Sequence, residues 1–276
     1  MKENLQKVYE NEKKRYDEFA NLNLKLDMSR GKPSKVQLDL SNGVLDILNS
    51  KSNTVGTLDY RNYGILDGIP EAKKLFATLC GVSEKEIMVL GNSSLNIMYD
   101  TLSRAMLFGV LDNKPLCKQE KLKWLCPVPG YDRHFGITEL FGFEMINIPM
   151  SPTGPDMDMI ENLVNNDESV KGIWCVPKYS NPQGIVYSDD TVRRFAKLSP
   201  KAKDFRIYWD NAYMIHSFKE DLPILNLLDE AKRNNNEDIV YMFGSTSKIT
   251  FPGAEISYMM ASENNINSLK KMMSLQ

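Results

Sequence analysis

The sequence predicts an α/β protein in which a mostly parallel sheet is flanked by helices. Short apolar runs that are typical of buried strands alternate with longer segments of helical periodicity. Turn residues and helix-capping residues separate the two kinds of segment. Chains that alternate in this way form parallel sheets covered on both faces.

The N-terminal part is expected to hold one amphipathic helix, at residues 2–20, packing on the outside of the body or on a partner. Its apolar side chains recur at roughly helical spacing, at Leu5, Val8, Tyr9, Tyr16 and Phe19. Glycine and proline then punctuate an irregular segment, residues 26–43. Arg30 in this segment could meet a carboxylate, although a surface arginine is the favoured interpretation.

A second helix is predicted at residues 71–80. Pro70 is placed to start it, and Gly81 is placed to end it. The loop before it, residues 59–70, carries Tyr60, Arg61 and Tyr63.

Strands and helices alternate regularly after this point. The predicted strands are 86–90, 123–126, 144–148, 172–176, 206–209, 239–243 and 256–261. The predicted helices between them are 95–110, 131–141, 156–165 and 188–198. Residues 265–276 look like the start of a helix that is ended without a cap, which suggests a truncation or a missing second domain.

Composition excludes several classes of protein. The 276 residues carry a net charge of -2, which gives no electrostatic footprint for nucleic acid or an acidic membrane. The four cysteines form no CxxC pair, so we expect reduced thiols, no disulfide framework and no metal site. The basic and acidic N-terminus lacks a signal peptide, and no run could span a bilayer, so a cytoplasmic location is expected.

Polar residues follow nearly every predicted strand, and most have an ordinary alternative explanation. The turn 91–94 could bind an anion through Ser93, Ser94 and backbone N–H groups, or Ser93 could simply cap the helix. Tyr131 could stack on a flat ligand, with His134 on the same helical face, or it could be a core tyrosine. Asn181 could bind a ligand oxygen or belong to a common Asn-Pro turn.

Two further strand ends carry ionisable groups. Asp210 directly follows a buried strand, where a carboxylate is costly unless it is paired, for instance with a protonated ring nitrogen. Alternatively, Asp210 could simply cap a helix. Tyr213 could point its hydroxyl at the same ligand as Asp210. Lys248 lies past another strand among hydroxyls and glycines, where it could act as a nucleophile or lie in a solvated loop.

The order of these motifs resembles the fold-type I pyridoxal-phosphate enzymes, specifically class I/II aminotransferases of an aspartate-aminotransferase-like bacterial subgroup. The motifs are the start RGKPS…LDLS, the turn GNSSLN, NPxG, DxAY and the segment STSKITFPGA. The resemblance runs from about Leu26 to Ala261. It implies transamination between an aspartate-like amino acid and a 2-oxo acid, with pyridoxal 5′-phosphate as cofactor, in a homodimer. It also implies an N-terminal arm and small-domain segment at 1–58, and a cofactor-binding large domain at 59–276.

The resemblance assigns a role to each motif residue. Lys248 would form the Schiff base, and Asp210 would keep the cofactor's ring nitrogen protonated. Tyr213 and Asn181 would bond the ring oxygen, Tyr131 would stack on the ring, and His134 would support Asp210. The residues that would hold the phosphate are Ser93, Ser94, Leu95 and Ser245, with Tyr63 reaching it across a dimer interface. Gly31 would lie near the substrate carboxylate.

Two departures from the pattern bear on activity. Most aminotransferases have a phosphate-binding arginine seven or eight residues after the lysine, where this chain has Glu255 and Ile256. We expect Glu255 to point away, because it would repel the phosphate. The arginine for the substrate α-carboxylate normally lies beyond residue 276. Alternatives are a β-lyase or decarboxylase on the same scaffold, or an inactive cofactor-binding fragment.

Overall fold

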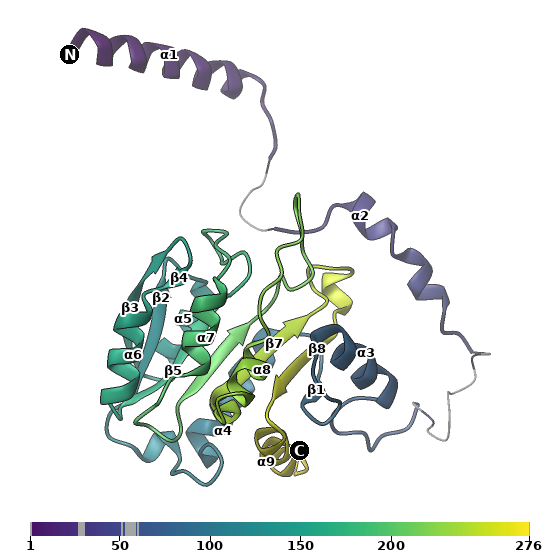
Figure 1. Ribbon diagram of the computed structural model, residues 1–276. Coiled ribbons are helices and arrows are strands. Elements are labelled where there is room, and N and C mark those ends of the chain that lie inside the picture. Colours follow the sequence, from purple (N-terminus) through teal and green to yellow (C-terminus); the bar gives the residue numbers. More distant parts are fainter. Residues whose placement is uncertain (1, 27–30, 51, 53–58, 60, 276) are drawn as a thin grey trace. The chain divides into compact units, whose positions relative to one another are not determined.

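The computed structural model describes residues 2–26, 31–50, 52, 59 and 61–275, and its centre is an eight-stranded sheet (Figure 1). The strand order is β1-β8-β7-β6-β5-β2-β3-β4. Their bounds are β1 (Ile87–Val89), β2 (Lys123–Val128), β3 (Glu144–Ser151), β4 (Gly154–Pro155), β5 (Val170–Cys175), β6 (Arg206–Asp210), β7 (Val240–Ser245) and β8 (Ser257–Ala261). The four pairings among β3, β2, β5, β6 and β7 are parallel, whereas β8 runs antiparallel to β7 and β1. The predicted mostly parallel sheet is confirmed, and the short antiparallel β4 is an addition.

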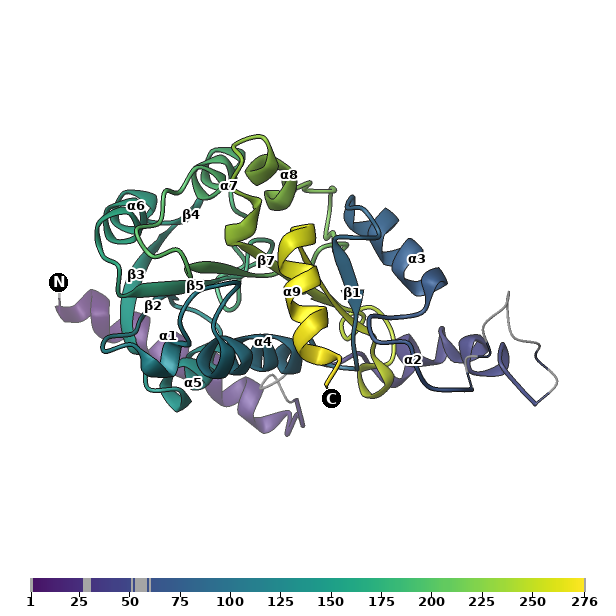
Figure 2. The same ribbon diagram turned by 90° about the horizontal axis from the view of Figure 1, so that it is seen from below.

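Helices cover both faces of this sheet, as Figure 2 shows from below. One face carries α3 (Pro70–Cys80), α6 (Met157–Asn166), α7 (Asp189–Ala196) and α8 (Leu227–Lys232). The other face carries α4 (Ser94–Phe108), α5 (Asp132–Leu140) and α9 (Glu263–Met273). Successive strand residues serve opposite cores: Trp209 packs in the first and Tyr208 in the second. This explains why the central strands are apolar throughout.

Local capping follows the sequence. Pro70 occupies the first turn of α3, and Gly81 ends the helix in the left-handed region at φ 66°. Ser93 caps α4 by accepting a hydrogen bond from the backbone N–H of Asn96. The predicted helices after β2, β3 and β5 are also present, whereas the short α2 (Lys35–Asp39) and α8 were not predicted.

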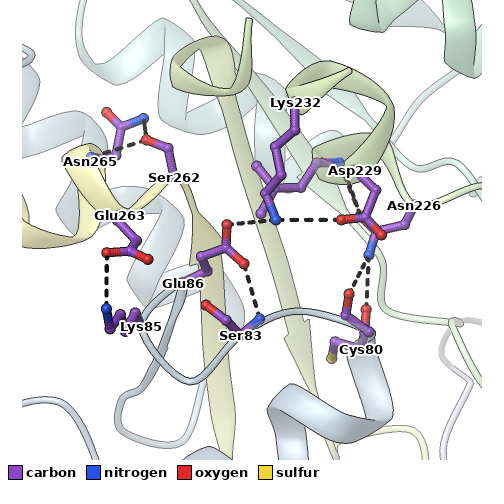
Figure 3. Close-up of polar contacts among 12 residues, drawn as sticks. Cys80, Ser83, Lys85, Glu86, Asn226, Asp229, Lys232, Ser262, Glu263 and Asn265 are labelled. Carbon is purple, nitrogen blue, oxygen red and sulfur yellow. Dashed lines mark hydrogen bonds and ion pairs between the residues drawn. The ribbon is translucent and has the colours of Figure 1, made fainter. Parts of the chain in front are cut away.

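Ion pairs and hydrogen bonds fasten the edge strand β1 to the rest of the large unit (Figure 3). Lys232 of α8 lies 2.6 Å from Oε1 of Glu86, just before β1. The other carboxylate oxygen of Glu86 accepts a hydrogen bond from the backbone N–H of Ser83 at 3.0 Å. Asn226 donates to the carbonyl oxygen of Cys80 at the end of α3. Side chains at the two ends of α8, Asn226 and Lys232, therefore hold the turn between α3 and β1 in place.

The chain divides into two compact units, residues 1–34 and 35–276. The first contains α1 (Lys2–Asn21), which confirms the N-terminal helix, and its apolar side chains from Leu5 to Phe19 are exposed. Packing of this helix on the body or on a partner stays a prediction. The predicted domain boundary after residue 58 also stays a prediction. Residue 58 and Arg30, which was considered as a partner for a carboxylate, lie outside the described residues.

Candidate active site

A cavity of about 230 Å³ lies at the carboxyl ends of the central strands. Helix α5 follows β2 over one face of the sheet, whereas α7 follows β5 over the other face. The connections therefore diverge between the neighbouring strands β2 and β5, which is where open α/β sheets form crevices. The residues that line the cavity are Ser93, Ser94, Leu95, Met98, Tyr131, Val176, Asn181, Asp210, Ala212, Tyr213, Ser247, Lys248 and Glu255.

Eight of the predicted site residues share this cavity, although they are up to 155 positions apart in the sequence. They are Ser93, Ser94, Leu95, Tyr131, Asn181, Asp210, Tyr213 and Lys248. Parallel strands explain the gathering, because their carboxyl ends meet at one edge of the sheet.

Asp210 ends β6 as a buried carboxylate with one oxygen paired. His134 of α5 donates from Nε2 to Oδ2 of Asp210 at 3.0 Å, and both side chains are buried. The His134 ring stacks on Trp174 with 4.7 Å between ring centres, which fixes its plane. Among the described residues Oδ1 of Asp210 has no hydrogen-bond partner. A buried carboxylate oxygen in this state is costly, so it suits a ligand that donates a hydrogen bond.

Two tyrosines approach this carboxylate in the cavity. Burial raises the pKa of Tyr213, and the nearby Asp210 and Tyr131 raise it further, so its hydroxyl keeps its proton at neutral pH. The ring of Tyr131 meets the His134 ring edge-on at 5.0 Å. Asn181 reaches the cavity from a turn in which Ser180 N–H donates to the carbonyl oxygen of Ile185. The site thus combines an aromatic face, a hydroxyl donor and an amide.

Lys248 lies in the loop that joins β7 to β8. Its backbone carbonyl oxygen accepts a hydrogen bond from Nε2 of His216 at 3.0 Å, and the His216 ring meets Tyr213 edge-on at 5.7 Å. His216 was not predicted as a site residue from the sequence. The signal was present, because the spacing from Tyr213 to His216 repeats the spacing from Tyr131 to His134.

Ser245 and Ser247 form a hydroxyl pair beside Lys248. Their Oγ atoms are 2.8 Å apart, and Ser245 is buried at the end of β7. Ser247, which was not predicted, lines the cavity in place of Ser245.

The expectation that Glu255 points away is wrong. Its half-buried side chain lines the same cavity as Lys248. Burial raises the pKa of Glu255, while a hydrogen bond from Ser247 and the charge of Lys248 act in the opposite direction. The cavity therefore contains a second carboxylate besides Asp210.

The N-terminus of α4 borders the cavity and offers donors to an anion. Ser93 is the N-cap, and Ser94 and Leu95 form the first turn, whose backbone N–H groups have no partner within the helix. The positive end of the helix dipole adds to this preference. Capping and anion binding are compatible here, because Ser93 uses its oxygen as a hydrogen-bond acceptor for the cap.

Tyr63 and Gly31 are the remaining predicted site residues. Tyr63 is 97% exposed and does not line the cavity. Gly31 belongs to the unit 1–34, so its predicted role stays a prediction.

Within the described ranges, none of the helices combines the length and apolar character needed to cross a membrane.

Comparisons with known proteins agree on one family. The family described as aspartate amino-transferase matches residues 1–276. The aspartate aminotransferase of Corynebacterium glutamicum is 44% identical over 260 residues, which is 93% of this chain and 60% of that protein. A solved aspartate transaminase from the same species superposes with a TM-score of 0.92 at 41% identity, covering 99% of this chain and 65% of the other. The α-aminoadipate aminotransferase LysN of Thermus thermophilus, solved with N-(5′-phosphopyridoxyl)-L-leucine, shares the fold at 18% identity, with a TM-score of 0.69 over 89% of this chain and 58% of the other. The chain spans about three fifths of the length of the curated relatives it matches.

Proposed function

Because the chain belongs to the aspartate aminotransferase family, we propose that its cavity binds pyridoxal 5′-phosphate and serves transamination between an aspartate-like amino acid and a 2-oxo acid. One observation carries the proposal: the amine-bearing Lys248 and the buried carboxylate of Asp210 line the same small cavity. The name of the 44% identical relative supports an aspartate-like donor. A cytoplasmic location stays a prediction from the sequence.

The residues of the cavity fit this cofactor. Oδ1 of Asp210, without a partner among the described residues, suits the N–H of a protonated pyridine ring. Tyr131 offers a ring face, and Asn181 and Tyr213 offer hydrogen-bond donors to the ring oxygen. The turn at the start of α4, with Ser93, Ser94 and Leu95, suits the phosphate, with Ser247 and Ser245 nearby.

Pyridoxal phosphate supplies an aldehyde and an electron-accepting ring when it is bound. The residues of the chain do the rest. Lys248 would hold the aldehyde, and its amine, placed beside the bound substrate, would move a proton away from the substrate Cα. Asp210 would keep the ring nitrogen charged, and His134 holds Asp210 in place through the 3.0 Å hydrogen bond. Tyr213, whose pKa is raised, stays a hydroxyl donor through this cycle.

We also propose that the protein works as a homodimer. Tyr63 is almost fully exposed, so its hydroxyl is available to reach a phosphate in the partner's cavity. Gly31 would lie near the substrate carboxylate, as the resemblance implies.

The test is covalent trapping of the cofactor. The protein is mixed with pyridoxal phosphate, reduced with borohydride, digested and analysed by mass spectrometry, with the exposed Lys219→Ala as matched control. We expect the reduced cofactor on Lys248 in wild type and control, and on no residue in Lys248→Ala. A modified peptide elsewhere, or an unchanged pattern in Lys248→Ala, would refute the assignment.

Product analysis then separates the reactions. Aspartate and 2-oxoglutarate should give oxaloacetate and glutamate in stoichiometric amounts. Release of carbon dioxide or of a β-substituent instead would favour a decarboxylase or β-lyase. Cofactor uptake without any product would favour a binding fragment.

A further inference from the structure

The carboxylate of Glu255 is placed where an anion is expected to bind. It lines the cavity together with Lys248 and Ser247, and it accepts a hydrogen bond from Ser247. The same cavity is bordered by the α4 N-terminus, which attracts negative ligands. The carboxylate of Glu255 would therefore repel an anion that binds at this turn in the same cavity.

The backbone fixes Glu255 in this position. β7 and β8 are antiparallel neighbours, with Ser245 opposite Ser257. Thr246 extends this pairing, because its N–H donates to the carbonyl oxygen of Ile256 at 2.9 Å and its Oγ1 accepts from the N–H of Ile256 at 3.0 Å. Glu255 therefore directly precedes Ile256, which forms two hydrogen bonds with Thr246 at the start of the loop that carries Lys248.

The charges that face Glu255 come from several elements. Lys248 is the cation of the same loop, Asp210 is the carboxylate at the end of β6, and Tyr213 and Tyr131 contribute phenols. Because the cavity has a volume of only about 230 Å³, these groups lie within about one Debye length of each other. Solvent ions therefore screen the electrostatic interactions between them only weakly. Since Tyr213 keeps its proton at neutral pH, Glu255 and Lys248 are the charged side chains at the lysine end of the cavity.

We propose that Glu255 controls cofactor capture, because its carboxylate attracts the charged amine of Lys248 and opposes the cofactor phosphate at the start of α4. Both effects act against uptake, since Lys248 must be neutral to attack the aldehyde. Both disappear when Glu255 takes up a proton. This inference rests on the proposed cofactor, and it adds a residue of this chain that sets the pH dependence of loading.

The experiment compares Glu255→Gln with wild type and with Glu139→Gln, an exposed glutamate of α5. Each protein is titrated with pyridoxal phosphate and with pyridoxal, which lacks the phosphate, by visible absorption between pH 5.5 and 8.5. We expect Glu255→Gln to bind pyridoxal phosphate about tenfold more tightly at pH 8. The gain for pyridoxal should be smaller. Both gains should fade toward acidic pH as wild-type Glu255, whose pKa is raised by burial, takes up its proton, and Glu139→Gln should match wild type throughout.

A second measurement needs no cofactor. The rate at which acetic anhydride labels Lys248, followed by peptide mass spectrometry, should rise several-fold in Glu255→Gln at pH 8, because the carboxylate that attracts the Lys248 amine is removed. Equal labelling rates and equal affinities at every pH would overturn the inference. Equal gains for pyridoxal and its phosphate would overturn the phosphate part. Absence of covalent cofactor in every variant would instead refute the proposed function, while the labelling rates still test the pairing of Glu255 with Lys248.

Discussion

The imidazole of His134 holds Oδ2 of Asp210 at 3.0 Å, in a pair in which both side chains are buried. The pair joins the first turn of α5 to the end of β6 and orients the carboxylate. The hydrogen bond occupies one oxygen of Asp210 and leaves Oδ1 without a partner among the described residues. A positioned, half-satisfied carboxylate of this kind is a feature of a functional site more than of a stable core.

His134→Phe should separate orientation from charge. The substitution keeps a flat ring against Trp174 but removes the donor to Asp210. We expect the free energy of unfolding to fall by about 1–3 kcal/mol, because a buried acceptor loses its partner. Urea denaturation measures this loss. Pyridoxal phosphate should also bind more weakly, and unchanged stability together with unchanged affinity would contradict the positioning role.

Asp210→Asn should remove the charge and keep the shape. The amide oxygen can still accept from His134, so the fold should melt close to the wild-type temperature. Under the proposed function, turnover of aspartate and 2-oxoglutarate should fall at least about a hundredfold, because a neutral amide would not hold the ring nitrogen protonated. Steady-state kinetics with saturating cofactor measure the effect. Wild-type turnover in this variant would refute the role of Asp210.

His216 should act on Lys248 through the backbone. His216→Phe keeps an aromatic ring beside Tyr213 and loses the 3.0 Å hydrogen bond to the Lys248 carbonyl oxygen. We expect cofactor uptake to weaken about tenfold, the equivalent of one hydrogen bond. His216→Gln can still donate and should recover part of the loss. If both variants bind the cofactor as wild type does, His216 does not position the lysine.

Asp167→Asn should cost stability in a pH-dependent way. The 2.9 Å ion pair with Lys123, followed by Ser169, lowers the pKa of Asp167 below its ordinary range. A carboxyl group with a lowered folded-state pKa stabilises the fold above its unfolded pKa of about 4 and loses this contribution as the pH falls. The variant should therefore unfold about 1 kcal/mol more easily at pH 7, since the pair is partly screened by solvent. The difference should shrink below pH 4, and the exposed Asp112→Asn is the control.

Thiol labelling should single out Cys117. It is exposed, whereas Cys80, Cys126 and Cys175 are buried. Burial raises the pKa of Cys80 to about 11 and that of Cys126 to about 12, and it raises the pKa of Cys175 well above its ordinary value. Since the thiolate is the reactive form, iodoacetamide at pH 8 should modify Cys117 first. Mass spectrometry of the folded protein counts the adducts, and rapid labelling of all four thiols would contradict the described burial.

The central strands and most helices could be predicted because their signals are local. A buried strand such as β6 is an apolar run, and the start and end of α3 carry Pro70 and Gly81. Elements without such signals escaped prediction. The two residues of β4 and the six of α8 are too short for a periodic pattern.

The part of the site that lies at the ends of the parallel strands could be predicted from the sequence. Once the sheet is parallel, Asp210 and Asn181 must approach each other, whatever their distance along the chain. Glu255 was misjudged for a different reason. The antiparallel direction of β8 has no sequence signature, and it is this direction that returns Glu255 to the side of Lys248. Similarly, His216 depends on the path of an irregular loop, which local propensity does not determine.

The hairpin of β7 and β8 has one more consequence. Both ends of the segment 246–256 are clamped to adjacent strands, through Ser245 opposite Ser257 and through Thr246 and Ile256. A protease that nicks this segment would leave each new terminus anchored in the same sheet. The nicked polypeptide should therefore elute from gel filtration as a single species and separate into two fragments only in denaturant.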